Sequence, residues 1–372
     1  MNSKEIKEIR KLYTKDRCSV SRLCGCYVNG EKEKVASFCG GLIGMEDEEL
    51  YKYMEILKKC LSGSFEKNLF NIEIPLQFEF NNDSYKLLTG MRDADLGNEA
   101  LMDAFYDRII ETYQHVGNFM IIAAIDTYDV PGRSKLGDTM ADASEESFKY
   151  IIAAICPVDL AKPGLCYNND EGWFMAVDRD WVVGAPEAGF MFPAFNDRST
   201  DLHAALYYAK NADALQDSFI EQMFGCETLV TAEQKKNAFG TVVSEVYGEE
   251  FDAETMKTVH ETLEEEAEII RNEPDMDNML SKTHVRNILE KSGADKEQMD
   301  RFDSAYDEML GDDTFVDIES LCGKKKFTVK NEAVEIKIAA DRTELIRFEE
   351  IGGKKCAVIE LDGATEINGV LV

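Results

Sequence analysis

Two short apolar runs in the first half of the chain share the pentapeptide IIAAI, at residues 121–125 and 151–155. Each run is continuously apolar and flanked by turn-forming residues, a pattern typical of strands that are covered on both faces. We therefore expect the two runs to lie side by side in the middle of a covered sheet. They are compatible with an ancestral repeat and with two unrelated buried strands, because the similarity outside the pentapeptide is slight.

Hydrophobic periodicity predicts further elements around these runs. Helical patterns cover residues 1–17, 46–61 and 97–114. Strand patterns cover residues 68–80, interrupted by Pro75, and residues 189–195, interrupted by Pro193. Residues 202–210 fit a helix or a strand, and their tyrosines favour the strand. Two hairpins are expected, one around a type I′ turn at Asn29-Gly30 and one over residues 164–177.

The pattern changes twice in the second half of the chain. Helical periodicity dominates for about a hundred residues from Asn211, and Asp295 with Gln298 resembles the capping box of one helix. From Phe327 the apolar residues alternate with polar ones, and Gly352-Gly353 and Asn368-Gly369 mark turns. The sequence thus predicts an α+β protein with a mixed α+β domain at 1–210 containing a mixed sheet, a helical segment at 211–312 and a small all-β module at 313–372.

The net charge of the chain limits the classes of molecule that it can bind. The 372 residues include 72 acids and 41 bases, which gives a formal net charge of -31. Such an acidic chain repels nucleic acid and anionic lipid, so we expect neither as a partner. Residues 181–195 form the longest weakly charged stretch, shorter than the ~20 residues that a membrane span requires. The charged N-terminus lacks the apolar segment of a signal peptide, which predicts a cytoplasmic protein.

The ten cysteines include the tight pair Cys24-Gly25-Cys26, with Cys18 and Cys39 nearby in the sequence. A reducing cytoplasm keeps thiols free. In a strand, Cys24 and Cys26 share one face, where they could bind a soft metal. No second spaced pair of Cys or His follows, so packing as small hydrophobic residues is the simpler interpretation.

Acidic residues follow two of the predicted strands, and they suggest a reaction site if the sheet contains parallel strands. The candidate catalytic residues are Asp126, Asp129, Asp197, Arg198, Asp201 and His203. Among them, Asp126, Asp129, Asp201 and His203 could hold Mg²⁺ or Mn²⁺, and Arg198 could bind an anionic substrate. The alternative interpretation is that these residues form turns, helix caps and a salt bridge.

Two classes of function remain open. No complete catalytic or nucleotide-binding motif occurs in the sequence. This favours a non-enzymatic binding or regulatory protein without a cofactor, whose helical segment or strand edges contact another protein. The alternative is a divalent-metal-dependent hydrolase or phosphoryl-transfer enzyme that uses the Asp and His residues.

Four segments also resemble a known family. They are RCSVSRLCGCYVNGEKE, DTYDVPG, ICPVDLAKPGLCYN and FPAFNDRSTDLHAALYY. Together they are similar to an uncharacterised domain-of-unknown-function family of anaerobic Gram-positive bacteria, over the full length of the chain. The resemblance implies a cytosolic bacterial protein with one continuous architecture. It implies no activity, cofactor or site residue.

Overall fold

The structure of the protein is a computed structural model, which divides into two compact units, Met1–Leu229 and Val230–Val372. It describes residues 1–14, 19–42, 45–133, 139–176, 179–226, 229–273, 278–312, 314–323, 326–361, 363–367 and 370–371. Within these residues, no helix is both long and apolar enough to cross a membrane.

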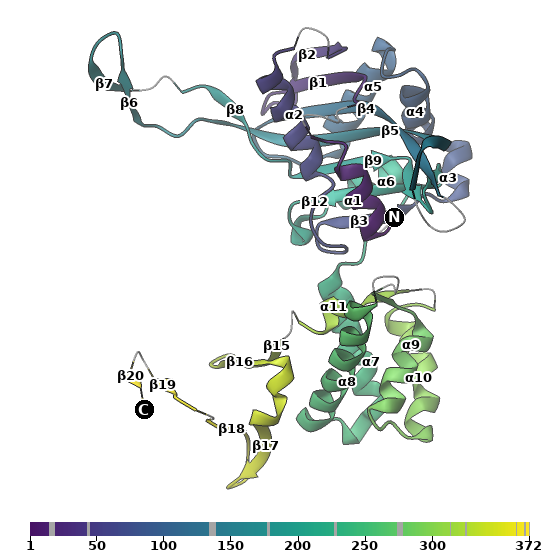
Figure 1. Ribbon diagram of the computed structural model, residues 1–372, viewed down its shortest axis with the longest axis vertical. Coiled ribbons are helices and arrows are strands. Elements are labelled where there is room, and N and C mark those ends of the chain that lie inside the picture. The colour runs from purple at the N-terminus through teal and green to yellow at the C-terminus, as the bar shows by residue number, and fades with distance from the viewer. Residues whose placement is uncertain are drawn as a thin grey trace. The chain divides into compact units, whose positions relative to one another are not determined.

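An antiparallel sheet forms the middle of the first unit (Figure 1). Its strands follow the order β2-β1-β4-β5-β9-β12-β3, and β8 pairs with the end of β5. The bounds are β1 Arg22–Val28, β2 Lys34–Gly40, β3 Leu69–Glu73, β4 Asn118–Arg133, β5 Thr139–Leu160, β8 Trp181–Val183, β9 Ala188–Phe192 and β12 Ala204–Ala209. Both IIAAI runs lie in the central strands β4 and β5, as the sequence predicts.

The two IIAAI runs pair with each other as antiparallel strands, and the middle residue of one run lies opposite the middle residue of the other. Ala123 lies opposite Ala153, and Ile121 lies opposite Ile155. On the other face of the sheet, Ile122 lies opposite Ala154. On that second face a large side chain therefore lies beside a small one, while on the first face the Ala123–Ala153 pair leaves a shallow space between pairs of isoleucines.

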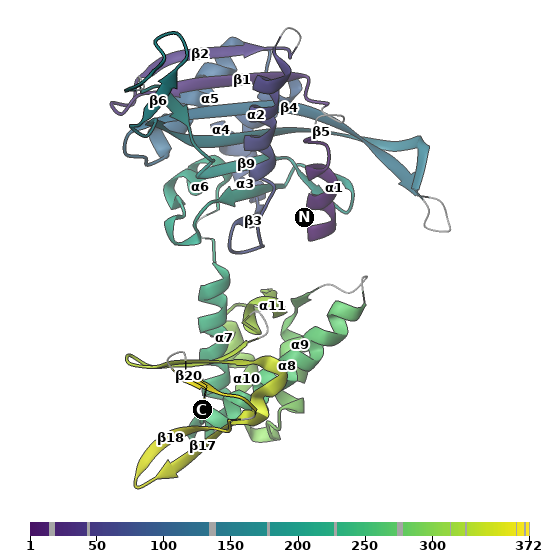
Figure 2. The ribbon, with the colours of Figure 1, turned by 60° about the vertical axis from the view of Figure 1, so that its left-hand side comes forward.

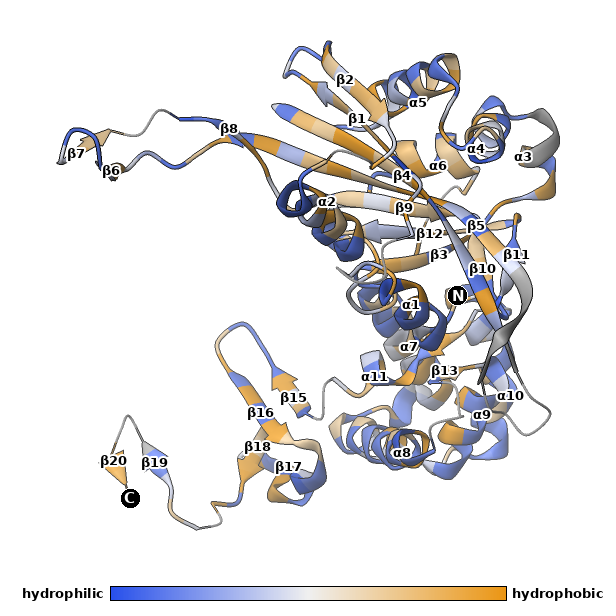
Figure 3. Cartoon of the chain, turned by 45° about the horizontal axis from the view of Figure 1, so that its top comes forward, coloured by the Kyte–Doolittle hydropathy of each residue, from blue (hydrophilic) through white to orange (hydrophobic). Residues whose placement is uncertain are grey.

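Helices cover both faces of this sheet, as Figures 1 and 2 show from two sides. Helices α4, α5 and α6 lie on one face, and their apolar residues join one core cluster with Ile121 and Ile155. Helices α1 and α2 lie on the other face and pack against Ile122 and Ile152. The bounds are α1 Ser3–Arg10, α2 Asp47–Lys59, α3 Leu76–Asn81, α4 Asp83–Asp93, α5 Glu99–Thr112 and α6 Asp217–Phe224. Figure 3 shows hydrophobic stretches along β4 and β8.

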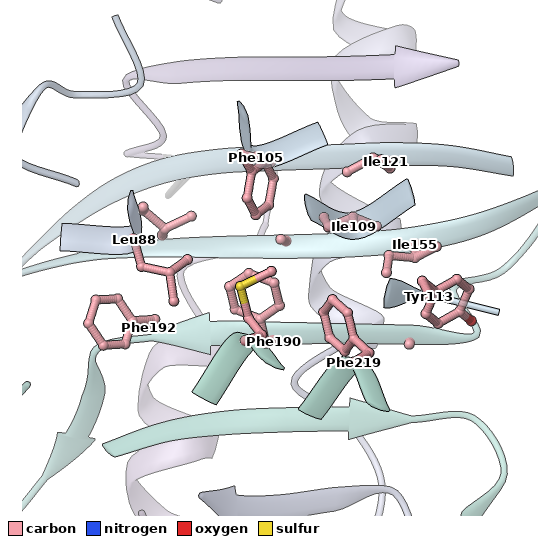
Figure 4. Close-up of a cluster of buried hydrophobic side chains, with 14 of the residues drawn as sticks. Leu88, Phe105, Ile109, Tyr113, Ile121, Ile155, Phe190, Phe192 and Phe219 are labelled. Carbon is pink, nitrogen blue, oxygen red and sulfur yellow. The ribbon is translucent and has the colours of Figure 1, made fainter. Parts of the chain in front are cut away.

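Aromatic rings fill the space between the sheet and helices α4 to α6 (Figure 4). Phe190 of β9 lies at the centre, with its ring 6.2 Å from that of Phe105 on α5 and 5.3 Å from that of Phe224 on α6. All three side chains are buried. Helix α6 is therefore part of the core of the first unit.

The predicted α+β class is confirmed, but the sheet is antiparallel rather than mixed. The reason lies in the segment between the two IIAAI runs. Strand β4 continues past the first run to Arg133 and β5 begins at Thr139, so the two strands form one extended hairpin. A hairpin connection makes its two strands antiparallel, while a parallel pair requires a crossover connection.

Several local predictions are confirmed and two are wrong in detail. Strand β12, the 164–177 hairpin and the Asp295–Gln298 capping box form as expected. The β1–β2 hairpin also forms, but its turn is not type I′. The Asn29 side chain accepts hydrogen bonds from the backbone N–H groups of Glu31 and Glu33, and Lys32 takes the positive φ of 63°. After Pro75 the chain forms helix α3 instead of continuing as a strand.

The second unit combines packed helices with small hairpins. Helices α7 Ala232–Tyr247, α8 Ala253–Asn272, α9 Lys282–Lys291, α10 Lys296–Met309 and α11 Ile318–Leu321 enclose one apolar core. Short strands β13 Met279–Leu280 and β14 Val316–Asp317 pair beside them. The hairpins are β15 Lys326–Lys330 with β16 Glu335–Ala339, β17 Ile346–Ile351 with β18 Lys354–Ile359, and β19 Glu366–Ile367 with β20 Val370–Leu371.

The Gly352-Gly353 turn is confirmed, while Asn368-Gly369 lies outside the described residues. The division at 210 and 312 stays a prediction.

Gly189 of β9 provides a test of how closely α2 and the sheet pack. A Cβ atom at this position would lie 2.5 Å from the Cys60 sulfur and 2.6 Å from the Ala153 carbonyl oxygen. We expect Gly189→Ala to lower the free energy of unfolding by about 2 kcal/mol, because the carbonyl belongs to the central strand and cannot move aside. The measurement is urea unfolding followed by far-UV circular dichroism.

Gly40→Ala, at the end of edge strand β2, is the matched control. Nothing lies within 4 Å of a Cβ atom at Gly40. We expect this variant to change the free energy of unfolding by less than about 0.5 kcal/mol. Equal unfolding curves for the two variants would contradict the close contact at Gly189.

Candidate functional site

Asp126, the first candidate, is buried in the sheet, where its carboxyl group accepts hydrogen bonds from side-chain and backbone donors. It lies on β4 directly opposite Tyr150 on β5 and is only 1% exposed. The Tyr150 hydroxyl donates to its Oδ2 over 2.8 Å, and the Thr127 N–H donates to its Oδ1 over 2.8 Å. The Tyr13 hydroxyl in turn donates to that of Tyr150 over 3.2 Å. Burial raises the pKa of Asp126, although hydrogen bonds from Ser19, Tyr150 and Thr127 oppose this effect.

Arg198, another of the candidate residues, connects helix α1 to strand β4. It lies with Asp197 at the two-residue turn between β10 Ala194–Asn196 and β11 Ser199–Asp201. Both turn residues have positive φ, of 50° and 60°. Nη1 of Arg198 donates to both carboxylate oxygens of Glu8 on α1 over 2.7 and 2.6 Å, and Nη2 donates to the Pro131 carbonyl over 3.0 Å. The guanidinium is thus engaged by α1 and β4.

Asp201 accepts hydrogen bonds from residues on both sides of it in the sequence. Its Oδ2 accepts a 2.6 Å hydrogen bond from the Asn196 side chain, and its Oδ1 accepts one of 2.9 Å from the His203 N–H. The amino group of Met1 donates to the side chain of Asn196 as well, and to Asn71 over 3.1 Å. Asp201 therefore acts through Asn196 in positioning the start of the chain.

The six candidates do not converge on one point. Asp129, Asp197 and His203 are exposed, whereas Asp126 is buried beneath β4 and β5. Across the part of the chain that the structure describes, no three His, Cys, Asp or Glu side chains gather where they could hold a metal ion. Strands β4 and β9 are both antiparallel to β5, so their C-terminal ends do share one edge of the sheet, where Arg198 donates to the Pro131 carbonyl. Within the described residues, sharing this edge does not bring the candidates together as a set of metal ligands. Metal binding by these residues stays a prediction that this geometry does not support.

The cysteine prediction requires one correction. A disulfide joins Cys24 of β1 to Cys39 of β2, which lie directly opposite each other in the hairpin. The expectation of free thiols is therefore wrong for this pair, because strand register brings the two residues together. Cys24 and Cys26 do share one buried face, as predicted. The cysteines of the described residues that lie outside this disulfide are Cys26, Cys60, Cys156, Cys166, Cys226, Cys322 and Cys356.

A feature that sequence reasoning missed is an apolar finger, which we define as residues 161–182. It contains the hairpin of β6 Leu165–Asn168 and β7 Trp173–Ala176, which projects beyond the pairing of β5 with β8 (Figure 1). Its last two residues, Trp181 and Val182, belong to β8 and pair with β5. Its exposed apolar side chains are Leu165, Tyr167, Trp173, Phe174, Met175, Trp181 and Val182. Trp173 is 72% exposed. The sequence predicts the hairpin, but no local pattern indicates that neither face is covered.

An apolar groove lies at the base of the finger. It has a volume of about 570 Å³ and lies between α2 and the segment that begins with β8. Tyr53 and Ile56 of α2 and residues 182–186 provide its apolar lining. Charged side chains of α2 also line it, namely Glu49, Lys52, Glu55 and Lys59. We call this the α2–β8 groove. Its size falls within the range of ordinary binding pockets.

Comparison with known families found one family model that matches nearly the whole chain. A family model described as a domain of unknown function, DUF4317, matches residues 1–370. The chain belongs to the DUF4317 family. This confirms the full-length resemblance to a family of unknown function, and both units, the finger and the groove lie within the DUF4317 match. No curated protein matches the chain.

The metal hypothesis can be tested by thermal unfolding of this DUF4317 chain with added Mg²⁺ or Mn²⁺. We expect neither ion to raise the unfolding midpoint, since the described candidate residues do not form a shared ligand set. An ion that binds the native state selectively would raise it by mass action. A rise in the wild-type chain that disappears in Asp201→Ala would contradict this expectation and support a metal site.

Burial of Asp126 makes the stability of the fold depend on pH, and the hydrogen bond from Tyr150 reduces this dependence. Because the folded-state pKa of Asp126 is raised, the folded chain binds this proton more tightly than the unfolded chain. This contribution to stability is present at low pH and is lost as the pH rises through the folded pKa. Tyr150→Phe removes a donor to the carboxylate, so it should raise the pKa of Asp126 further. We expect a loss of about 1.5–3 kcal/mol in the free energy of unfolding at pH 8 and a smaller loss at pH 5.

Tyr106→Phe is the control for that measurement by urea unfolding. The Tyr106 hydroxyl is buried and has no hydrogen-bond partner among the described residues. Its removal should therefore change the free energy of unfolding by less than about 0.5 kcal/mol at both pH values. A Tyr150→Phe cost that matches this control, or that does not vary with pH, would contradict the role assigned to the Asp126–Tyr150 bond.

Proposed function

We propose that this chain is a non-enzymatic binding protein that contacts a protein partner through its apolar finger. The exposure of the finger is the observation that supports this role. Both tryptophans of the chain, Trp173 and Trp181, lie on it and are more than half exposed. Burial of one large apolar side chain contributes about 1.5–3 kcal/mol, and contiguous exposed apolar surfaces mark interaction sites.

The finger has the composition of a binding surface. Trp, Tyr, Phe and Met are enriched at protein interfaces, and Trp173, Tyr167, Phe174 and Met175 supply all four types. The rings of Tyr167 and Phe174 lie 5.5 Å apart and nearly perpendicular, so they already support each other. A two-stranded hairpin alone is only marginally stable in water. A partner that covers one face would bury these side chains and stabilise the hairpin.

Protein is the partner class that suits the charge of the chain. A net charge of -31 opposes binding to nucleic acid and to anionic lipid. Strands β6 and β7 carry no Asp, Glu, Lys or Arg, so contact with the finger rests on apolar burial. The contacts of Asp126 and Arg198 within the fold favour this binding role over the metal-dependent hydrolase or phosphoryl-transfer alternative.

The cytoplasm of a bacterium is the compartment that we propose. The resemblance to proteins of anaerobic Gram-positive bacteria supports it. The disulfide between Cys24 and Cys39 is unusual for that compartment, because a reducing cytoplasm opens most disulfides. Opening this bond leaves the β1–β2 hairpin in place, because its strands are paired from Leu23 to Val28 by backbone register.

Affinity capture with the full chain as bait tests the binding role. The finger variant is Trp173→Ser with Phe174→Ser. We expect the partner to be recovered by the wild-type chain and reduced at least tenfold with the finger variant, since aromatic anchors dominate interface energies. The variant should unfold at the wild-type midpoint, because both side chains are exposed and contribute little to the folded core.

The matched control replaces exposed apolar residues of the same unit outside the finger. Leu76→Ser with Val116→Ser removes side chains that are 62% and 99% exposed. This control should recover the partner as the wild-type chain does. Identical sets of captured proteins from the finger variant and the control would remove the support for a binding role of the finger.

A further inference from the structure

We infer that the partner of the apolar finger is a second copy of this chain, whose α2–β8 groove receives the finger. The inference rests on the proposed function and names its partner. Its structural basis is that one unit carries both an exposed apolar projection and an apolar groove. The identity of the partner follows from how these two features are placed and charged.

The groove adjoins the base of the finger. Val182 belongs to the finger and also lines the groove, next to Val183 and Gly184. The finger extends away from this point, as Figures 1 and 3 show in two views, so its tip lies far from its own groove. A two-fold axis that crosses the finger midway between its base and its tip would place the tip of each finger over the groove of the other copy. Such an exchange uses the same two surfaces twice and closes as a dimer.

The apolar contents of the two surfaces match. The groove offers Tyr53, Ile56 and Pro186, and the finger offers Trp173 and Phe174. Aromatic side chains that enter a pocket and become fully desolvated are the usual anchors of protein interfaces. Both grooves would be filled and both fingers covered in the same step, so the exchange removes the main exposed apolar surface of each first unit.

Charge explains how two acidic chains can meet at this place. Each copy carries -31, so contact over most of the surface would set acids against acids. The groove is different, because its two acids, Glu49 and Glu55, are balanced by Lys52 and Lys59. The acidic turn of the finger, Asp170-Glu171, would face those lysines across the interface. The approach of the uncharged strands β6 and β7 to this groove avoids repulsion and gains complementary charges at the rim.

Cross-linking between differently tagged copies tests the exchange. Cys166 on β6 is an exposed thiol. One sample carries it unchanged, and the other carries Cys166→Ser with Glu55→Cys in the groove. We expect a short bismaleimide to give a mixed dimer of the two samples. The same experiment with Asp83→Cys in place of Glu55→Cys is the control, because Asp83 is exposed on α4, which covers the opposite face of the sheet. It should give no mixed dimer.

Light scattering after size-exclusion chromatography supplies the second measurement. We expect twice the mass of one chain for the wild type and for Leu76→Ser with Val116→Ser. Trp173→Ser with Phe174→Ser should raise the dissociation constant of the dimer at least about tenfold. Circular dichroism checks that all variants keep their fold, so that loss of the dimer reports on the interface.

Three outcomes would overturn the inference. A wild-type chain that stays monomeric at 100 micromolar and forms no mixed dimer excludes the second copy, and finger-dependent capture of another protein would then preserve the proposed function alone. A dimer that the finger variant leaves unchanged uses another surface. Finger-dependent flotation with phosphatidylcholine vesicles, without a dimer in solution, identifies a lipid surface as the partner and refutes the proposed function too.

Discussion

The first unit depends on one constraint, which is that the central pair of strands is covered on both faces. Each face of β4 and β5 must be apolar, and the pairing of one IIAAI run with the other achieves this. Alanine at 123 and 153 leaves room for α4 to α6, while Ile122 and Ile152 contact α1 and α2. The burial of apolar surface on two faces supplies the main stabilisation of this layered arrangement.

The acids that follow these strands contribute to the same arrangement. Asp126 links β4 to Tyr150 of β5, and Arg198 connects α1 to the extension of β4 through Glu8 and Pro131. Asp201 holds its own turn next to the amino group of Met1. These contacts give the residues structural roles. The sequence signal that suggested chemistry, polar residues at strand ends, also marks the turns and joints of a sheet.

The apolar side chains of the finger, unlike these acids, have no structural role in the core of the first unit, because they are exposed. Side chains such as Trp173 and Phe174 usually enter a core, and here the chain holds them away from every helix of the first unit. The α2–β8 groove lies at the base of the same finger and combines an apolar lining with balanced charge. A projection and a groove on one unit are the two components that a reciprocal dimer requires.

The sequence by itself determined the α+β class, the central place of the IIAAI strands, the strand at 204–209 and the capping box at Asp295, because these follow from local periodicity and local hydrogen bonds. The direction of β5 relative to β4 and the pairing of Cys24 with Cys39 were decided by tertiary structure. So were the separation of the six candidate residues and the exposure of the finger. Periodicity records which side chains avoid water, whereas strand direction, cross-strand neighbours and the cover of a hairpin depend on contacts between distant residues, which no local pattern contains.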